Sequence, residues 1–175
     1  KLTETMYANN SFVSVTPRSV IARALVVVED DAELTIVDAI SGSEHGDSQI
    51  LTVVEFILGA RARVEYITLN AMDDKAQVLT GIGVVMGREA QFNAVNFALG
   101  GKASRHQIHA KLAGEGARIA LRGVSLIRGE QHADTTLVVD HQAPGCESRE
   151  LFRALVDGEG TGVFQGKIVV RQAAQ

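Results

Sequence analysis

The sequence has a single cysteine, Cys146, among 175 residues, and no tryptophan. One cysteine cannot form a disulfide within the chain, so we expect a fold held by its core in a reducing compartment. Aromatic residues make up 5% of the chain, too few to predict a base-stacking platform for single-stranded nucleic acid. The formal net charge of −4 also argues against a protein that binds by neutralising phosphates.

Long apolar runs and prolines are scarce as well. No apolar stretch reaches the roughly 18 residues that a membrane-spanning helix needs. The chain has 2 prolines, 17 glycines and 46% apolar residues, which excludes a disordered or collagen-like protein. Its length predicts one domain over residues 1–175. No signal-like apolar segment follows Lys1, so we expect a cytoplasmic location.

The main positive feature of the sequence is a regular repeat. Polar or glycine-rich breaks begin near residues 29, 41, 58, 70, 86, 99, 114, 127, 140 and 157. Every second break gives steps of 26 to 30 residues, mostly 28 or 29. A fixed period of this size is typical of solenoids. Because each period holds two β-rich runs and no helical insert, it predicts an all-β fold, a parallel β-helix with two strands per rung of about 28 residues. A leucine-rich repeat is disfavoured, since its Leu-x-x-Leu-x-Leu pattern is absent.

Most of the expected strands follow directly from the breaks. Val20–Val28 is a nearly continuous apolar run, which predicts a strand covered on both faces. Ser148–Val156 has apolar residues at helical as well as strand spacing, and its place in the repeat favours a strand. The other expected strands span residues 11–15, 32–40, 50–58, 63–69, 77–86, 91–99, 104–112, 117–126, 135–140 and 161–170.

Two histidines, His106 and His109, would share one face of a helix and could there bind a metal together. In a strand, residues an odd number apart point to opposite sides. Since residues 104–112 are expected to form a strand, we predict no shared metal site, and a surface or hydrogen-bonded role for at least one of the two.

His141 and Cys146 flank the turn Gln142–Gly145, so a loop could bring them together. Imidazole and thiolate are suitable ligands for zinc or iron. Two ligands do not complete a site, however, and a lone cysteine usually serves as a small apolar residue. They remain weak candidates, and we expect no metal, cofactor or catalytic residue in this chain. A nucleophilic Cys–His pair is disfavoured because no orienting carboxylate or carboxamide can be assigned.

A carbohydrate-active enzyme is the alternative from another class, because many β-helix proteins act on polysaccharides. Such an enzyme needs paired carboxylates about 5–9.5 Å apart. The candidate acids all stand in expected turns, where turn preference explains them without catalysis. They are Asp30, Asp31, Asp73, Asp74, Asp140 and Asp157. The segment Gly162–Lys167 has the wrong spacing for a phosphate loop and continues as a strand.

The C-terminal half resembles the SufB/SufD family of the SUF iron–sulfur cluster assembly system. The motifs are His141-Gln-Ala-Pro-Gly-Cys-Glu-Ser-Arg-Glu-Leu-Phe-Arg153 and Asp157-Gly-Glu-Gly-Thr-Gly-Val-Phe-Gln-Gly-Lys-Ile-Val-Val170. Arg105-His106 and Leu112-x-Gly-Glu-Gly-Ala117 also fit, and these features look closer to SufD than to SufB.

The resemblance implies a right-handed parallel β-helix core, in agreement with the repeat found above. It also implies a non-catalytic, SufD-like scaffold that pairs with a SufB-like subunit and is worked by the SufC ATPase. We expect the chain to be a core fragment without flanking helical segments. The cluster ligands and ATPase-docking helices implied by the family would then lie outside it, and the cluster would be handled by the full complex. In isolation we expect a homodimer formed edge to edge, with no nucleic-acid or membrane partner.

Overall fold

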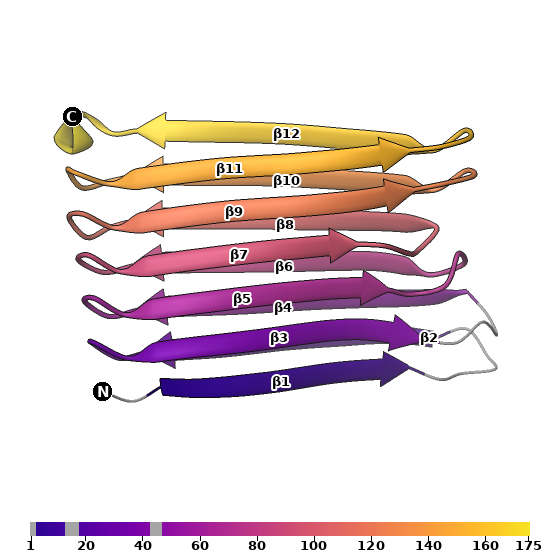
Figure 1. The fold of residues 1–175 in the computed structure, drawn as a ribbon, viewed down its shortest axis with the longest axis horizontal. Helices are drawn as coiled ribbons and strands as arrows, with labels where there is room; N and C mark the ends of the chain where they lie inside the picture. Colours follow the sequence, from indigo (N-terminus) through magenta and orange to yellow (C-terminus); the bar gives the residue numbers. More distant parts are fainter. Residues whose placement is uncertain (1–2, 13–17, 43–46) are drawn as a thin grey trace.

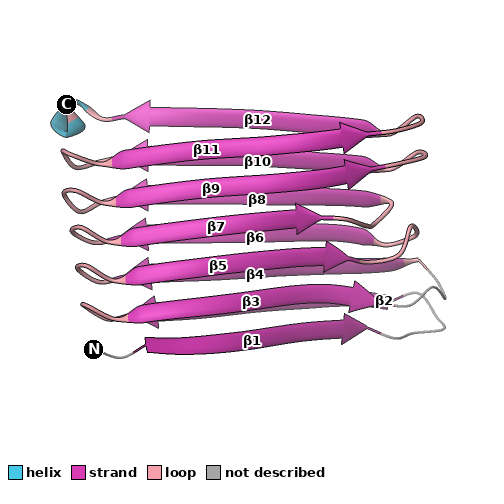
Figure 2. Cartoon of the chain, viewed as in Figure 1, coloured by secondary structure: helices cyan, strands magenta, loops and turns pink. Residues whose placement is uncertain are grey.

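The computed structural model describes residues 3–12, 18–42 and 47–175. These residues form twelve β-strands and one short 3-10 helix (Figures 1 and 2). The strands are β1 (Thr3–Phe12), β2 (Arg18–Val28), β3 (Glu33–Gly42), β4 (Ser48–Leu58), β5 (Arg63–Ala71), β6 (Gln77–Met86), β7 (Gln91–Ala98), β8 (Ala103–Leu112), β9 (Arg118–Ile127), β10 (His132–His141), β11 (Glu147–Val156) and β12 (Thr161–Val170). The 3-10 helix, η1, spans Gln172–Ala174.

The strands coil into two parallel sheets, and each rung gives one strand to each sheet. The odd sheet has the order β1-β3-β5-β7-β9-β11, and the even sheet the order β2-β4-β6-β8-β10-β12. In Figure 1 the odd strands cross the front from left to right and the even strands return behind them as the chain climbs. This path is a right-handed coil, so the predicted parallel β-helix with two strands per rung is confirmed.

The register confirms the predicted period. Residues paired in adjacent rungs are 30 positions apart at Thr3–Glu33, 26 at Gln77–Ala103 and 29 at His132–Thr161. The period varies because the turns differ in length while the strands keep nearly the same length. Each side chain therefore stacks on its equivalents in the rungs above and below, which forms rows that run along the solenoid axis.

An aromatic stack holds the centre of the core between the two sheets. The ring centroid of Phe56 lies 5.0 Å from that of Tyr66 and 5.1 Å from that of Phe92, both in edge-to-face geometry. All three side chains are buried. Edge-to-face pairs add to the free energy gained by burying the rings themselves.

One row inside the odd sheet, made of Asp38, Thr68 and Asn96, is polar, and Tyr66 of the neighbouring row bonds to it. The hydroxyl of Tyr66 donates to Asp38 Oδ2 at 3.0 Å, and the hydroxyl of Thr68 donates to Asn96 Oδ1 at 2.7 Å. Burial, together with the neighbouring Asp38, raises the pKa of Tyr66 well above its usual value. The buried polar groups of this row are thus bonded from rung to rung, as burial in an apolar core requires.

The turns from even to odd strands repeat one backbone conformation. Asp31, Arg61 and Glu89 have φ of 61°, 59° and 56°, and Gly116 and Gly145 take equivalent places with φ of 69° and 68°. A positive φ is uncommon in residues other than glycine and has a cost in conformational energy. Here it is stabilised by hydrogen bonds between turns, such as the one from the N–H of Arg61 to the carbonyl of Arg88 at 2.8 Å.

One predicted strand is confirmed and another is corrected at its start. Ser148–Val156 is a strand, as its place in the repeat favoured, and lies within β11. The expected strand over Ser11–Val15 is wrong at its start, because residues 11 and 12 end the long strand β1 and pair with Ser41 and Gly42. Residues 13–17 lie outside the described part of the chain.

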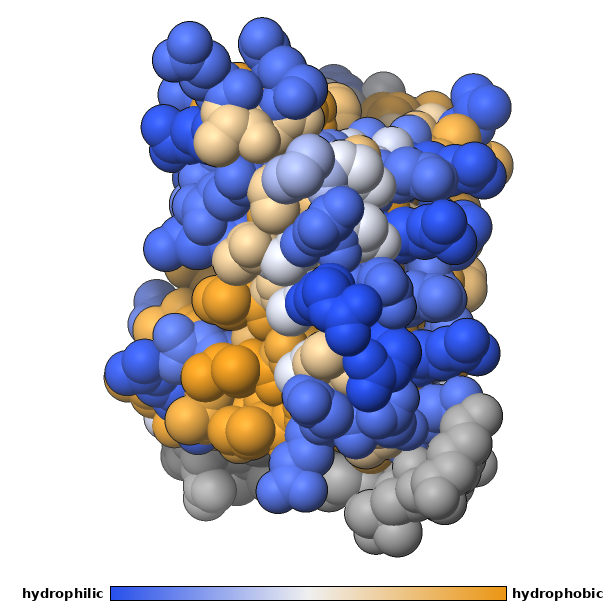
Figure 3. Space-filling model, turned by 90° about the vertical axis from the view of Figure 1, so that its left-hand side faces the viewer, coloured by the Kyte–Doolittle hydropathy of each residue, from blue (hydrophilic) through white to orange (hydrophobic). Residues whose placement is uncertain are grey.

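The prediction that Val20–Val28 is covered on both faces is wrong. Ile21, Leu25 and Val27 of β2 are 76%, 62% and 61% exposed. Outward residues of the next strands, including Ile57 and Val85, continue this apolar surface, which is visible low on the left in Figure 3. An apolar run therefore does not distinguish a doubly covered strand from one with an apolar outer face. No helix in the described part of the chain is long and apolar enough to span a membrane.

Candidate functional site at the end of the solenoid

His141 and Cys146 flank the turn between β10 and β11 at the last rung. His141 is the last residue of β10, and Cys146 directly precedes β11. In the earlier rungs the rows that contain these two positions are apolar. The His141 row continues Val28, Leu58, Met86 and Leu112. The Cys146 position continues the alanines 32, 62, 90 and 117, which follow the residues of positive φ.

Two further inward positions change at the same rung. Ser148 takes the place of Leu34, Val64, Phe92 and Ile119 in the preceding rungs. Glu150 takes the place of Ile36, Tyr66, Ala94 and Leu121. The last rung therefore has four residues with polar or ionisable groups where earlier rungs bury almost purely apolar side chains. We call this group, His141, Cys146, Ser148 and Glu150, the polar corner.

Two atoms of the polar corner are buried without a hydrogen-bond partner in the described part of the chain. They are Nε2 of His141 and Oε1 of Glu150. Leaving such a group unbonded costs about 1–3 kcal/mol of stability. The Cys146 thiol, by contrast, donates to the carbonyl oxygen of Gly114 at 3.3 Å. Among the described residues no three His, Cys, Asp or Glu side chains are grouped to hold a metal ion.

A salt bridge flanks the polar corner. Arg171, just after β12, donates to both carboxylate oxygens of Asp140 at 2.8 and 3.0 Å, and Gln142 adds a bond at 2.9 Å. The hydrogen bond from Arg171, followed by that from Gln142, lowers the pKa of Asp140. The same pairing raises the pKa of Arg171. Asp140 is therefore a bound structural carboxylate, which leaves it little basicity for proton transfer.

The opposite end of the last rung is aromatic. The rings of Phe152 and Phe164 lie 5.1 Å apart, at the mouth of a cavity of about 100 Å³ whose wall includes Ser125 and Thr135. Gly123 lies beneath this pair, and a Cβ there would overlap the Phe152 ring. Phe164, which lines this cavity, is 53% exposed.

The last strand of each sheet has an open edge. β11 ends the odd sheet and β12 ends the even sheet. Inward-facing residues of β12, such as Ile168 and Val170, are 47% and 53% exposed because no further rung covers them. Nearly all residues of β12 are therefore exposed, on both faces of the strand. Open edges and uncovered apolar residues are features of surfaces that pair with another strand.

The two central histidines point to opposite sides of β8, as predicted. His109 is exposed. His106 is 5% exposed, and its Nδ1 lies 2.7 Å from the hydroxyl of Thr80. Burial lowers the pKa of His106 to about 4, so its ring is neutral at ordinary pH. The pair cannot bind one metal ion, and His106 is a hydrogen-bonded core residue.

Five of the six turn acids, all but Asp157, accept hydrogen bonds through their side chains within the described part of the chain. Asp31 forms an ion pair with Arg61 at 2.6 Å, and hydrogen bonding from that arginine lowers the pKa of Asp31. Asp30 accepts from the backbone N–H of Ala60 at 2.7 Å, and Asp73 from that of Lys75 at 2.9 Å. Asp74 accepts from Gln131 at 2.8 Å. These contacts account for the acids as turn-stabilising groups and favour no glycosidase pair.

Glu150 and Arg171 belong to the end site, and the sequence reasoning did not single them out. Glu150 could have been recognised from the sequence. Writing the rungs one under another at the period of 26 to 30 would have shown four rows losing their apolar residues at one rung. The pairing of Arg171 with Asp140 depends on turn geometry, which the period alone does not specify.

The fold and its end define a class: a right-handed parallel β-solenoid with two open strand edges and an uncovered core at its last rung. Comparison with known proteins then gives the family. Residues 10–175 match the family model described as SUF system FeS cluster assembly, SufBD core domain. The chain belongs to this family, which confirms the resemblance.

Three relatives illustrate the range of the similarity. An iron–sulfur cluster assembly SufBD family protein of Synechocystis is 27% identical over 93% of this chain. Protein ABCI7, chloroplastic, of Arabidopsis thaliana is 27% identical over 87% of it. The iron–sulfur cluster assembly protein SufD of Escherichia coli is 24% identical over 83% of it. The matched region spans 38%, 33% and 34% of these relatives, respectively.

Proposed function

We propose that this chain is the β-helix core of a non-catalytic, SufD-like scaffold in SUF iron–sulfur cluster assembly. The observation that carries the proposal is the family match over residues 10–175, together with the open strand edges at the last rung. In this proposal the core is one domain located in the cytoplasm. The iron–sulfur cluster is cargo of the complete assembly, and this chain holds no cofactor of its own.

The proposed partners are a SufB-like subunit and a SufC-like ATPase. The SufB-like subunit binds through strand pairing at the open end, and the ATPase acts on the assembled pair. Two features support pairing at this end. A strand laid on β11 or β12 would satisfy free backbone groups and would cover apolar residues such as Phe164 and Ile168. In isolation, a second copy of the chain takes the partner's place in a closed two-fold dimer.

The hydrogen-bond pattern of β12 identifies a substitution that affects the open edge alone. Thr161 and Arg171 donate their backbone N–H groups to β10 and its preceding turn, at Gln131 and His141. Alternate N–H groups of a strand point to opposite sides, so odd-numbered residues of β12 bond to β10 and even-numbered ones face the open edge. Gly166 is even-numbered, and a Cβ there would meet only ordinary contacts. Gly166→Pro therefore removes an edge donor and leaves the bonds to β10 intact.

The test is co-expression with the SufB-like and SufC-like proteins of the same organism, with an affinity tag on the SufB-like subunit. We expect the chain to co-elute with the SufB-like subunit, and Gly166→Pro to abolish this. Arg63→Gln, on the outer face of the odd sheet, is the matched control and should not change it. Failure of the unmodified chain to co-elute would reject the proposed partner.

Self-pairing is tested separately by sedimentation of the chain alone. At tens of micromolar we expect a dimer that becomes a monomer on Gly166→Pro. Val169→Pro serves as a contrast, because position 169 bonds to β10 and its loss should lower the melting temperature as well. A monomeric unmodified chain would reject the dimer. It would not reject the SufB-like partner, which the co-expression experiment tests.

A further inference from the structure

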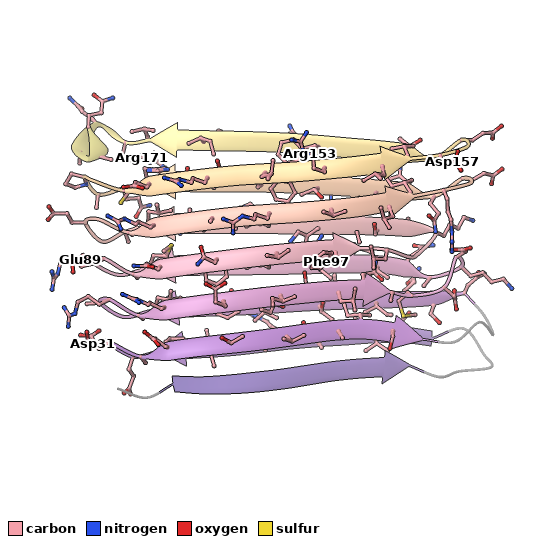
Figure 4. All side chains as sticks on the ribbon, in the orientation of Figure 1. Asp31, Glu89, Phe97, Arg153, Asp157 and Arg171 are labelled. Carbon is pink, nitrogen blue, oxygen red and sulfur yellow. The ribbon has the colours of Figure 1, made fainter. Side chains whose placement is uncertain are left out.

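Three arginines on the outer face of the odd sheet lack a salt-bridge partner among the described residues. Arg122 of β9 and Arg149 and Arg153 of β11 are exposed, and none forms a salt bridge with a residue that the structure describes. We call these three residues the arginine triangle. Figure 4 labels Arg153 on β11, away from Arg171, which is paired at the left end.

The register brings the three arginines close together. Arg122 pairs with Leu151, which lies midway between Arg149 and Arg153 on β11. With strands about 4.8 Å apart and residues about 3.3 Å apart, the Cα of Arg122 is about 8 Å from each of the other two, and theirs are about 13 Å apart. The outward residues of β9 and β11 include four arginines and one glutamate, although the whole chain has a net charge of −4.

The same face is charge-balanced elsewhere. Arg63 lies 3.7 Å from Glu33, and Arg118 lies 3.6 Å from Glu147. The triangle is therefore a local departure from a pattern in which outward arginines have an acidic neighbour one rung away. Unpaired arginines repel one another at this spacing, and a partner that supplies carboxylates would remove that repulsion.

Apolar side chains lie between and beside the arginines. Leu151 and Leu155 of β11 are 51% and 59% exposed, and Leu126 of β9 is 45% exposed. The exposed leucines favour an amphipathic partner over a single phosphate, because a phosphate would leave these apolar side chains uncovered. Extended nucleic acid is disfavoured by the net negative charge of the chain.

We propose that the arginine triangle binds an acidic amphipathic helix of a partner protein. Residues four apart on a helix rise about 6 Å, so acids at positions i, i+4 and i+8 span about 12 Å. That spacing places the outer two acids opposite Arg149 and Arg153 and the central acid opposite Arg122. Apolar residues on the same helix face then contact Leu151 and Leu155. The surface is on the sheet face and not at the open edges, so the proposal is independent of strand pairing.

The test is fluorescence anisotropy with a labelled helical peptide of about 20 residues, a length at which an isolated helix can form. This peptide has Glu at positions i, i+4 and i+8, and Leu at neighbouring positions on the same face of the helix. A second peptide has Gln in place of Glu. Replacing Arg122, Arg149 or Arg153 with Gln should weaken binding of the Glu peptide about threefold each. Replacing all three should weaken it roughly thirtyfold, and these losses should be smaller at high salt. Arg63→Gln is the matched control and should leave the affinity within twofold.

Three outcomes would overturn the proposal. The Gln peptide could bind as tightly as the Glu peptide, or the triple variant could bind like Arg63→Gln. An oligonucleotide or inorganic phosphate could also bind more tightly than the Glu peptide and lose that binding in the triple variant. Because all three residues are exposed, their substitution should leave the melting temperature unchanged, which the same samples can verify.

Discussion

At the middle rungs Phe56 is enclosed between Tyr66 and Phe92, whereas at the last rung Phe164 contacts Phe152 and faces solvent on its other side. The two regions share strand length, register and turn positions. They differ in what lies above them. A middle rung is covered by neighbours on both sides, so its inward residues are selected for packing. The inward residues of the last rung combine apolar and ionisable groups.

The largest effect that separates the two regions is expected from truncating their aromatic residues. Phe56→Ala should lower the free energy of unfolding by about 3–5 kcal/mol, because it opens a cavity in the buried core. Phe164→Ala should cost about 1 kcal/mol or less, since half of its surface is already in water. Denaturant unfolding of the two variants measures both values. Equal losses would show that the last rung is as tightly packed as the middle ones.

Acidification is expected to destabilise the middle rungs through His106. Its pKa is about 4 in the folded protein, against 6.5 for a free histidine. Between these two values the unfolded chain binds a proton that the folded protein excludes. The stability due to the neutral ring is therefore complete above pH 6.5 and is lost as the pH falls towards 4. The loss should be on the order of 3 kcal/mol.

Unfolding of His106→Gln at several pH values tests this expectation. The variant should show a smaller decrease in unfolding free energy between pH 6.5 and 4 than the unmodified chain. The exposed His132 is the control, and His132→Gln should keep the full decrease. The explanation is wrong if all three proteins lose stability in parallel.

Sequence periodicity predicted the rungs because each strand must present alternating faces and each turn must fit the one below. It also predicted that His141 and Cys146 flank one turn, which is the turn between β10 and β11. It did not predict which faces are covered. The apolar residues of β2 are exposed, and those of β12 have no rung above them, although their patterns match those of buried strands. Ion pairs such as Asp140–Arg171 depend on the rotation of long side chains at turns, which no spacing encodes.

The polar corner gives a prediction of intermediate size and opposite sign. Glu150→Leu restores the apolar character of its row, in which Leu121 is the preceding residue and is fully buried. Removing a buried oxygen that lacks a partner should raise the free energy of unfolding by about 1–2 kcal/mol. Glu147→Leu on the same strand is the control, because Glu147 is exposed, and it should change stability by less than about 0.5 kcal/mol. A loss of stability in Glu150→Leu would mean that Glu150 has a favourable partner in solution.

Cys146 should give the smallest effect. It occupies the position of the alanines at 32, 62, 90 and 117, and the shortest of its weak thiol hydrogen bonds is to the carbonyl oxygen of Gly114. Cys146→Ala thus introduces the residue that four earlier turns have at this position. The change in unfolding free energy should stay below about 1 kcal/mol. Cys146→Ser keeps a donor for Gly114 and should likewise leave the fold unchanged. Iron and zinc content, measured in both variants and in the unmodified chain, distinguishes a packing residue from a ligand. Metal at one equivalent that disappears on either substitution would show that Cys146 and His141 bind it.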